Sequence, residues 1–500
     1  MQQFLPHISN QLNDILSSLP LFKPEMGLAI LFLLVLIADL VYRKSCGGVS
    51  RMLACAGMLL VLAADLGQDL LIDEEARLLF NGNLILHHSN IVLKLVMDSV
   101  AFILLLYFPW DDDLKAHKKG LGDAYTIIVA SVFGLHLMIM SATMLTIFIS
   151  IEMVSIASYL LVAYRSGNGL SAEAGLKYVL FGLASSAVML YGMSLFYGFA
   201  GTINLFDAEL VSRLQQADGM SVSLSLFLIL AGIGFKLSFV PLHFWVPDVY
   251  QGASTPVTAY LSTLPKIAGF GLLVTLLTPF ISNPAWTQVD FRLILSVTGI
   301  ITMIAGNFAA VWQQNIKRML AYSSIGHTGF ALMAVVTFSA QGIEALNFYL
   351  AVYALANLGI LILVSYFANT MQAHTLEDYK GLGSKYPIAS VSFVVLLISL
   401  TGIPVSAGFS GKLLVFSAVY EIYQSGHNPL LLALLITGAA TTVVSLFYYI
   451  KVPLYLFLKK SDADTGFYPA TSKNLLTMII VIAIAVVLLG VFPHVLTDLM

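Results

Sequence analysis

The sequence predicts an all-α polytopic membrane protein with about fourteen transmembrane helices. Of its 500 residues, 59% are apolar and only 10% are charged, whereas a soluble globular domain has about 25% charged residues. The mean hydropathy is +0.90. Apolar runs of about 20 residues, the length that crosses a bilayer, recur along the whole chain. The net charge of −3 gives no basic character that would indicate a nucleic-acid partner.

The expected spans follow one another at short intervals. Their approximate limits are 25–43, 51–67, 91–109, 123–140, 142–164, 174–200, 222–250, 256–281, 291–312, 318–339, 344–368, 387–423, 429–458 and 473–496. The seventh and the twelfth are too long or too interrupted to be single rods. We therefore expect helices 7 and 12 to be discontinuous.

The loop charges predict an orientation. Loops after odd-numbered spans carry fourteen Lys and Arg residues, whereas loops after even-numbered spans carry only Arg77, Arg213 and Arg292. Positive loops face the cytoplasm. We therefore expect both termini on the outer side.

A weak internal repeat predicts the domain organisation. EAGLKYVLFGLASSA from Glu173 resembles EALNFYLAVYALANL from Glu344. The two segments lie five spans apart, and an odd offset turns the second copy upside down, as in inverted repeats. Helices 4–8 and 9–13 would form the two units. The predicted divisions are 1–122, 123–281 for the first five-helix repeat, 290–460 for the second, and 461–500.

The stretch from Gly234 to Lys266 is the most unusual part of the chain. It contains four prolines and opens and closes near a lysine. Proline removes a backbone donor and clashes with the preceding turn, so we expect helix breaks at Pro241 and Pro265, and another at Pro404. Charges beside broken helices at membrane depth are typical of ion sites. We interpret this stretch as half of a proton path.

Several charges lie inside the spans. An Asp, Lys or Arg at the bilayer centre costs about 2.5–3.5 kcal/mol on insertion scales, so each of them requires a reason. The residues that we expect to translocate protons are Glu152, Lys177, Lys236, Lys266 and Lys412, with His243 and His327 as relays. For each one, a structural salt bridge or hydrogen bond is the alternative. Lys94 and Lys451 lie near span ends, where a long side chain can reach the interface, and their roles stay open.

Buried lysines suit a proton path for a physical reason. Burial disfavours the charged form of a lysine, and a nearby carboxylate favours it again. If Glu152 pairs with Lys236, weakening of that pair would release a proton to the next group. Histidine titrates closest to neutrality and is a natural relay. The expected order is Glu152, Lys236, Lys266 with the His243 region, His327 and Lys412.

Other motifs exclude rival functions. Cys46 and Cys55 form no CxxC or metal-ligand spacing. The Gly-x-Gly segments complete no dinucleotide fingerprint, and no P-loop is present. We therefore expect no cofactor in this chain and no ATP-driven transport. The acidic clusters Asp73–Glu75 and Asp111–Asp113 are interpreted as solvated surface.

Three phrases carry a family resemblance: FKLSFVPLHFWVPDVYQGASTPVTAYLSTLPK, NIKRMLAYSSIGHTGF and GIPVSAGFSGK. Together with Glu152 they resemble the antiporter-like membrane subunits of respiratory complex I over about residues 90–460, and within them the subunit N branch of bacterial NADH–quinone oxidoreductase. The resemblance implies fourteen helices with two inverted five-helix units.

The resemblance also implies roles for single residues. Glu152 and Lys236 match the charged pair of the family, with Lys177 nearby. Lys266 matches its central lysine and Lys412 its terminal lysine, while His243 and His327 match its connecting histidines.

The resemblance further implies a setting. It is a bacterial plasma (inner) membrane, beside antiporter-like subunit M, the small K/J-type subunits and a peripheral redox arm. The whole complex would use NADH, FMN, iron–sulfur clusters and a quinone.

Two alternatives remain. The chain could belong to a multisubunit Na⁺/H⁺ antiporter without redox activity, although those relatives usually carry glutamate at the position of Lys412. It could also be a structural spacer whose charges only hold helices together.

Overall fold

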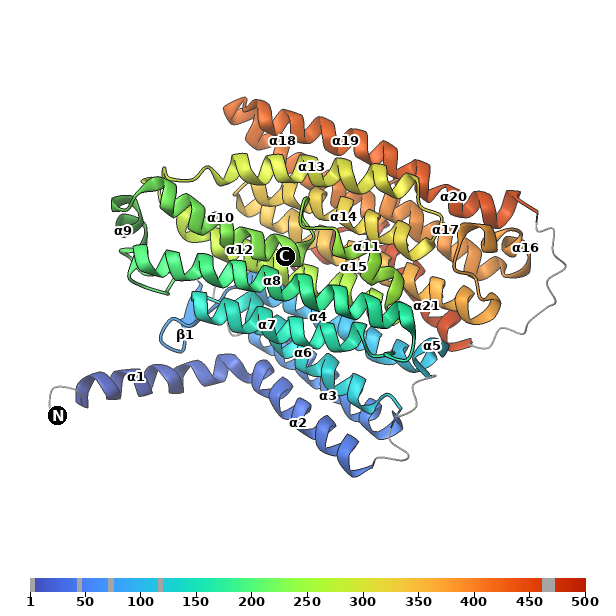
Figure 1. The fold of residues 1–500 in the computed structure, drawn as a ribbon, viewed down its shortest axis with the longest axis horizontal. Helices are drawn as coiled ribbons and strands as arrows, with labels where there is room; N and C mark the ends of the chain where they lie inside the picture. The colour runs from blue at the N-terminus through green and yellow to red at the C-terminus, as the bar shows by residue number, and fades with distance from the viewer. Residues whose placement is uncertain (1–4, 43–46, 71–75, 116–119, 461–472) are drawn as a thin grey trace.

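The computed structural model describes residues 5–42, 47–70, 76–115, 120–460 and 473–500. Helices laid side by side form most of it (Figure 1). Some sequence predictions fall outside the described residues, namely those on Arg43, Lys44, Cys46, Asp73–Glu75, Lys118 and Lys119, and on most of the loop before the last span.

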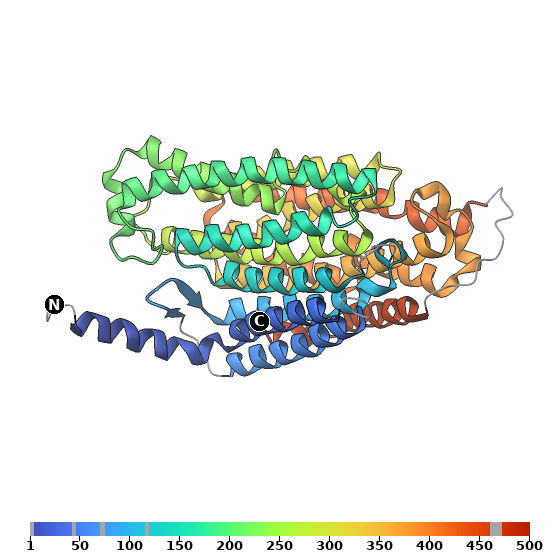
Figure 2. The ribbon, with the colours of Figure 1, turned by 60° about the horizontal axis from the view of Figure 1, so that its bottom comes forward.

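The described residues up to Met140 form four helices of 19 residues or more, the shorter helix α1 and a small hairpin. The elements are α1 Leu5–Ser18, η1 Leu19–Phe22, α2 Lys23–Val41, α3 Gly47–Asp69, β1 Arg77–Leu79, β2 Leu84–Leu86, α4 His88–Tyr107, η2 Phe108–Trp110, α5 Asp112–Lys115 and α6 Gly122–Met140. Helix α1 projects away from the bundle (Figure 2).

The remaining elements follow in the expected order. They are α7 Met144–Val162, α8 Gly169–Ala200, α9 Leu210–Gln216, α10 Gly219–Leu237, α11 Trp245–Gly252, α12 Thr255–Ile281, α13 Phe291–Val311, α14 Ile316–Val336, α15 Ala340–Met371, η3 Leu376–Tyr379, α16 Leu382–Lys385, α17 Pro387–Thr401, α18 Ala407–Gly426, α19 Pro429–Tyr449, α20 Lys451–Pro453, η4 Leu454–Leu458, α21 Lys473–Val491 and α22 His494–Thr497.

The membrane-protein prediction is confirmed. Within the described ranges, 13 helices are long and apolar enough to cross a membrane. The twelfth predicted span, 387–423, is not among these 13 helices, because it consists of α17 and α18, which are separated by a short interruption. Elements after odd-numbered spans, such as α5 and α16, lie at one end of the bundle, and β1 and α9 lie at the other (Figure 1).

Both predicted interruptions are present, but one predicted helix break is wrong. Pro241 lies between α10 and α11, and Pro404 lies between α17 and α18. Pro265, in contrast, lies inside the continuous helix α12. A proline removes only one intrahelical hydrogen bond, and a helix surrounded by protein can tolerate this loss in a membrane. The α12 residues around Pro265 are fully buried among neighbouring helices, so packing keeps the helix intact.

The two five-helix units share a pattern of neighbours. In the first unit α6 packs on α7 and on α12, and α8 packs on both halves of the broken helix, α10 and α11. In the second unit α13 packs on α14 and on α19, and α15 packs on α17 and α18. This correspondence supports the predicted repeat, while the domain limits at 122, 281, 290 and 460 remain predictions.

The centre of the bundle is formed by α12, α14 and α15. These helices are almost entirely buried, whereas α8, α19 and α21 expose much of their surface. Amphipathic patterning is therefore weak at the centre, because every face of these helices contacts protein. Polar side chains on them are enclosed by protein on all sides.

A two-stranded hairpin was not expected. β1 and β2 pair antiparallel with Arg77 opposite Leu86. Leu79, Leu84 and Leu86 pack with Met140 in a small separate core. The hairpin lies at one end of the bundle (Figure 1), where Leu84 also forms a β-bridge with Ser141 after α6.

Candidate functional site

Lys236 lies in the last turn of α10, just before the interruption. Its side chain is buried, and its Nζ donates a hydrogen bond of 2.5 Å to Ser155 Oγ on α7. The rings of Tyr159 and Tyr178 lie 5.3 and 5.9 Å from the ammonium group. Aromatic faces attract a cation, and more strongly when it is desolvated. The surroundings of Lys236 can thus hold either a charged or a neutral amine.

Glu152 lies one turn before Ser155 on α7, but the predicted direct ion pair is not formed. Glu152 Oε1 accepts a hydrogen bond of 2.5 Å from Ser186 Oγ on α8. Among the described ion pairs, none joins Glu152 to Lys236. The physical reason is that a serine hydroxyl satisfies each charge separately. Ser155, the hydrogen-bond partner of Lys236, lies one turn from Glu152, so both charges are held at the same region of α7.

Lys266 lies on α12 and faces α14. Its Nζ donates to Ser324 O at 2.8 Å, to Ser324 Oγ at 2.7 Å and to Thr328 Oγ1 at 2.8 Å. Ser324 Oγ is also hydrogen-bonded to the Tyr353 hydroxyl on α15, at 2.7 Å. All three ammonium protons therefore have acceptors, and no carboxylate is among them.

Hydroxyl groups occupy the space between Lys236 and Lys266. Tyr260 on α12 is hydrogen-bonded to Ser131 on α6 and, at 3.1 Å, to Ser158 on α7. Ser158 lies one turn after Ser155, the partner of Lys236. A hydroxyl can donate and accept at the same time. We call these side chains, with the groups around Lys266, His327 and Lys412, the thread. Among the described hydrogen bonds, none joins Tyr260 to the partners of Lys266.

His327 continues the thread on α14, one turn after Ser324. Its Nδ1 lies 2.6 Å from the Tyr349 hydroxyl and its Nε2 lies 3.1 Å from the Tyr449 hydroxyl. Tyr449 is in turn hydrogen-bonded to Ser323. The imidazole is thus held between α15 and α19 by two groups that can each exchange a proton with it.

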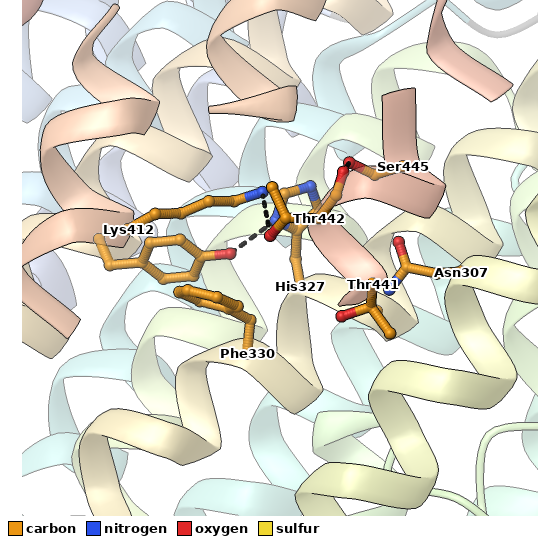
Figure 3. A pocket seen from close by; sticks show the side chains of 9 residues that line it. Asn307, His327, Phe330, Lys412, Thr441, Thr442 and Ser445 are labelled. Atoms are coloured by element: carbon orange, nitrogen blue, oxygen red, sulfur yellow. Dashed lines mark hydrogen bonds between the residues drawn. The ribbon is translucent and has the colours of Figure 1, made fainter. Parts of the chain in front are cut away.

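Lys412 lies on α18 beside the second interruption. Its Nζ donates to Thr401 O at 2.8 Å, at the end of α17, and to Thr442 Oγ1 at 3.4 Å. The side chain points toward His327 and Thr442 in Figure 3. Lys412, His327 and Thr442 line a cavity about the size of one water molecule. Its lining residues are Asn307, Gly326, His327, Phe330, Tyr349, Lys412, Thr441, Thr442 and Ser445.

Lys177 and His243 are not part of this thread. Lys177 is partly exposed and forms ion pairs of 2.8 Å with both Glu173 and Asp248, and Asp248 also pairs with Arg318 at 2.7 Å. His243 is half-buried, and its Nδ1 has no hydrogen-bond partner. Lys177 thus belongs to a network of ion pairs near the end of the bundle. Its partner Asp248 was not assigned a role from the sequence.

Lys94, whose role the sequence left open, does not reach the interface. Its side chain is fully buried. It contacts Glu25 and Asp65, from two other helices. Lys451, by comparison, is half-buried and donates to the backbone carbonyl of Val311. The acids had been available in the sequence as isolated charges in apolar runs, but their convergence depends on tertiary packing.

Comparisons with known proteins agree with this geometry. Residues 141–442 match the family model described as NADH:quinone oxidoreductase/Mrp antiporter, TM. A relative from Chloroherpeton thalassium, NADH-quinone oxidoreductase subunit N 2, is 38% identical over 92% of this chain and 90% of its own length. The chain belongs to the subunit N family of NADH–quinone oxidoreductases.

Solved structures also share the fold of this member of the subunit N family. A chain of respiratory complex I from Thermus thermophilus with bound aureothin has a TM-score of 0.77 at 28% identity, covering 95% of this chain and 98% of that one. A chain of the Mrp complex from Dietzia sp. has a TM-score of 0.79 at 19% identity, with 96% of each chain covered. The second likeness shows a shared fold alone.

Proposed function

We propose that this chain conducts protons in the membrane arm of an NADH–quinone oxidoreductase, through the thread that joins Lys236, Lys266, His327 and Lys412. The observation that carries the proposal is that each of these four buried groups is hydrogen-bonded to at least one hydroxyl group. The thread crosses from α10 to α18 through the most buried helices of the bundle. Charges that only hold helices together would need no such row of buried hydroxyls.

The chemistry at each lysine is proton exchange with a hydroxyl or an imidazole. Lys266 can take a proton while Ser324 and Thr328 accept hydrogen bonds from its ammonium form. When it gives a proton up, its lone pair accepts a hydrogen bond from one of the same hydroxyls. His327 can take a proton on one nitrogen and release one from the other. Lys412 receives it across the cavity, through a water molecule that the cavity has room for.

Glu152 is proposed to control Lys236. In the structure Glu152 is held by Ser186 and Lys236 is held by Ser155. A rotation of Glu152 toward Lys236 would favour the charged lysine, and its return would favour release of the proton. Coupling would thus arrive through a movement of α7 against α8 and α10, and not through a redox group in this chain.

The remaining assignments follow from this proposal. NADH, FMN, the iron–sulfur clusters and the quinone would be bound by other subunits of the complex. The neighbours would be the antiporter-like subunit M, the small K/J-type subunits and, beyond them, the peripheral redox arm. The site would be the bacterial plasma membrane, with both termini on the outer side.

The experiment uses Glu152→Ala and Lys236→Ala in the assembled complex. We expect each change to lower the number of protons pumped per NADH oxidised in proteoliposomes. Lys115→Ala serves as the control, because Lys115 is exposed and its ion pair among the described residues is with Asp112 at the surface. An unchanged proton stoichiometry in both variants would refute the proposal. Na⁺-driven pH changes in vesicles without NADH would instead support the Na⁺/H⁺ antiporter alternative.

A further inference from the structure

Five ionisable side chains meet inside the N-terminal helices, outside the thread of lysines. Glu25 lies on α2, Asp65 on α3, Lys94 and Asp98 on α4, and His136 on α6. The side chains of all five are completely buried. Charged side chains are almost never fully buried unless they are paired. The pairing within this cluster therefore decides what it can bind.

Two cations are held by carboxylates of the cluster. Lys94 Nζ lies 2.6 Å from Glu25 Oε1 and 2.9 Å from Asp65 Oδ1. His136 Nδ1 lies 3.2 Å from Glu25 Oε1, and His136 Nε2 lies 2.9 Å from Asp98 Oδ1. An imidazole whose two nitrogens both face carboxylate oxygens is a donor at both, which is the protonated form. Lys94 and His136 thus supply two positive charges.

Three carboxylates face these two cations, so one negative charge is in excess. Glu25 Oε2, Asp98 Oδ2 and both carboxylate oxygens of Asp65 have no hydrogen-bond donor among the described residues, although Lys94 Nζ lies 2.9 Å from Asp65 Oδ1. A buried negative charge in excess is unfavourable. Binding of one proton by a carboxylate of the cluster removes it.

We propose that the cluster is a second proton-binding site of this chain, and that Asp65 or Asp98 holds its one exchangeable proton. A proton from water binds one carboxylate oxygen and forms an O–H bond there. The cluster then carries no net charge, which suits its complete burial. This proposal does not depend on the thread of lysines and makes a separate prediction.

A metal ion is less compatible with the same geometry. One donor atom each from Glu25, Asp65 and His136 lies within 4.8 Å of the others, close enough to share an ion. However, the Lys94 ammonium already contacts both of these carboxylates. An added divalent cation would sit beside a positive charge in apolar surroundings. A proton neutralises the excess charge without displacing Lys94.

The position of the cluster favours exchange with one side of the membrane. Asp65 lies one turn before the end of α3, and Lys94 lies in the second turn of α4. The helix ends at this side carry an exposed pair, Asp69 with His88, at 2.9 Å. Gln68 accepts a hydrogen bond of 2.6 Å from Lys94 and lies between the cluster and that pair in sequence. The hairpin end of the bundle is therefore the expected entry (Figure 1).

Infrared difference spectroscopy of the purified complex tests whether the cluster binds this proton. A protonated carboxylic acid has a C=O stretch that an ionised carboxylate lacks, and it shifts in D₂O when the proton exchanges. We expect one such band in the range from about pH 5 to about pH 9. Asp65→Asn and Asp98→Asn should each remove it. Asp69→Asn should leave it unchanged, because Asp69 is exposed and outside the cluster.

A second comparison separates this site from a structural ion cluster. Asn at position 98 can accept from His136 and carries no charge, so it resembles a protonated acid. Asp98→Asn should therefore assemble normally, whereas Asp98→Ala should lower the yield of assembled complex. Loss of assembly with Asp98→Asn, or absence of the band in wild type, would overturn the proposal. Stoichiometric binding of Mn²⁺ that Asp65→Asn abolishes would also overturn it, in favour of a metal site.

Discussion

Replacing Lys266 by methionine separates proton transfer from structural support. Methionine has nearly the length of lysine and no charge. The three acceptors of Lys266 keep other partners, because Ser324 O also accepts from Thr328 Oγ1 at 3.1 Å and Ser324 Oγ is bonded to Tyr353. Lys266→Met therefore leaves no acceptor unpaired. The cost of burying an ammonium ion, several kcal/mol, disappears with the charge.

The two consequences have opposite signs. Lost hydrogen bonds to a charged group contribute about 1.5–3 kcal/mol each, and removal of the buried charge offsets them. Replacement of buried ions by apolar groups is neutral or stabilising by about 1–4 kcal/mol. Proton transfer, in contrast, loses one acid–base group, which typically contributes about 10²–10⁴-fold in rate. We expect normal assembly and strongly reduced pumping.

The assay reconstitutes the assembled complex in proteoliposomes and compares NADH oxidation with acidification of the lumen. Leu264→Met is the matched control, because Leu264 lies on the same helix, is fully buried and has a similar volume. A wild-type proton stoichiometry in Lys266→Met would refute the reasoning. Failure to assemble, with normal pumping by whatever complex forms, would favour the structural-spacer alternative.

Two further changes test other features. Burial raises the pKa of Asp111, just beyond the end of the α4 span, from 3.8 to about 6, although the Ser365 hydroxyl donates to it at 2.7 Å. The folded protein therefore binds this proton more tightly than the unfolded chain, and stability falls as the pH rises from about 4 to 6. At pH 8, Asp111→Asn should raise the free energy of unfolding by up to about 3 kcal/mol, which thermal unfolding would show as a higher midpoint. Near pH 4 the substitution should have no such effect. An equal gain at both pH values would contradict this. Gly408→Ala should prevent formation of the second interruption, since the new Cβ would lie 1.8 Å from Ser399 O. The control is Gly198→Ala, whose Cβ meets no atom within 4 Å. It should be neutral or stabilising by about 1 kcal/mol in thermal unfolding. Equal stability of the two glycine variants would show that this contact can relax.

The spans and the deep lysines could be predicted because an apolar chain makes each charge conspicuous. Lys236, Lys266, Lys412 and His327 were found in this way, and the structure places hydroxyl groups beside each of them. The hydroxyls themselves could not be predicted. Serine and tyrosine are common in membrane helices, and nothing in the order of the residues shows that Ser324 meets Tyr353 across two helices.

The error at Pro265 and the open role of Lys94 have a common physical origin. The surroundings of Lys94 depend on how three other helices pack around it. Pro265 was judged by its effect on an isolated helix, but the neighbours of α12 hold that helix together. Depth along a span and local propensity are properties of one segment, whereas burial belongs to the assembly of segments.

The serine and tyrosine links between the lysines impose a rule on turnover. When a proton passes along a row of hydroxyls, each O–H breaks on one side and forms on the other, so the whole row ends up pointing the opposite way. A second proton cannot follow in the same direction until every hydroxyl has swung back. On the proposed path the row would therefore deliver one proton and then need to be reset, and the slowest rotation of a hydroxyl or of the His327 ring would set an upper bound on its frequency.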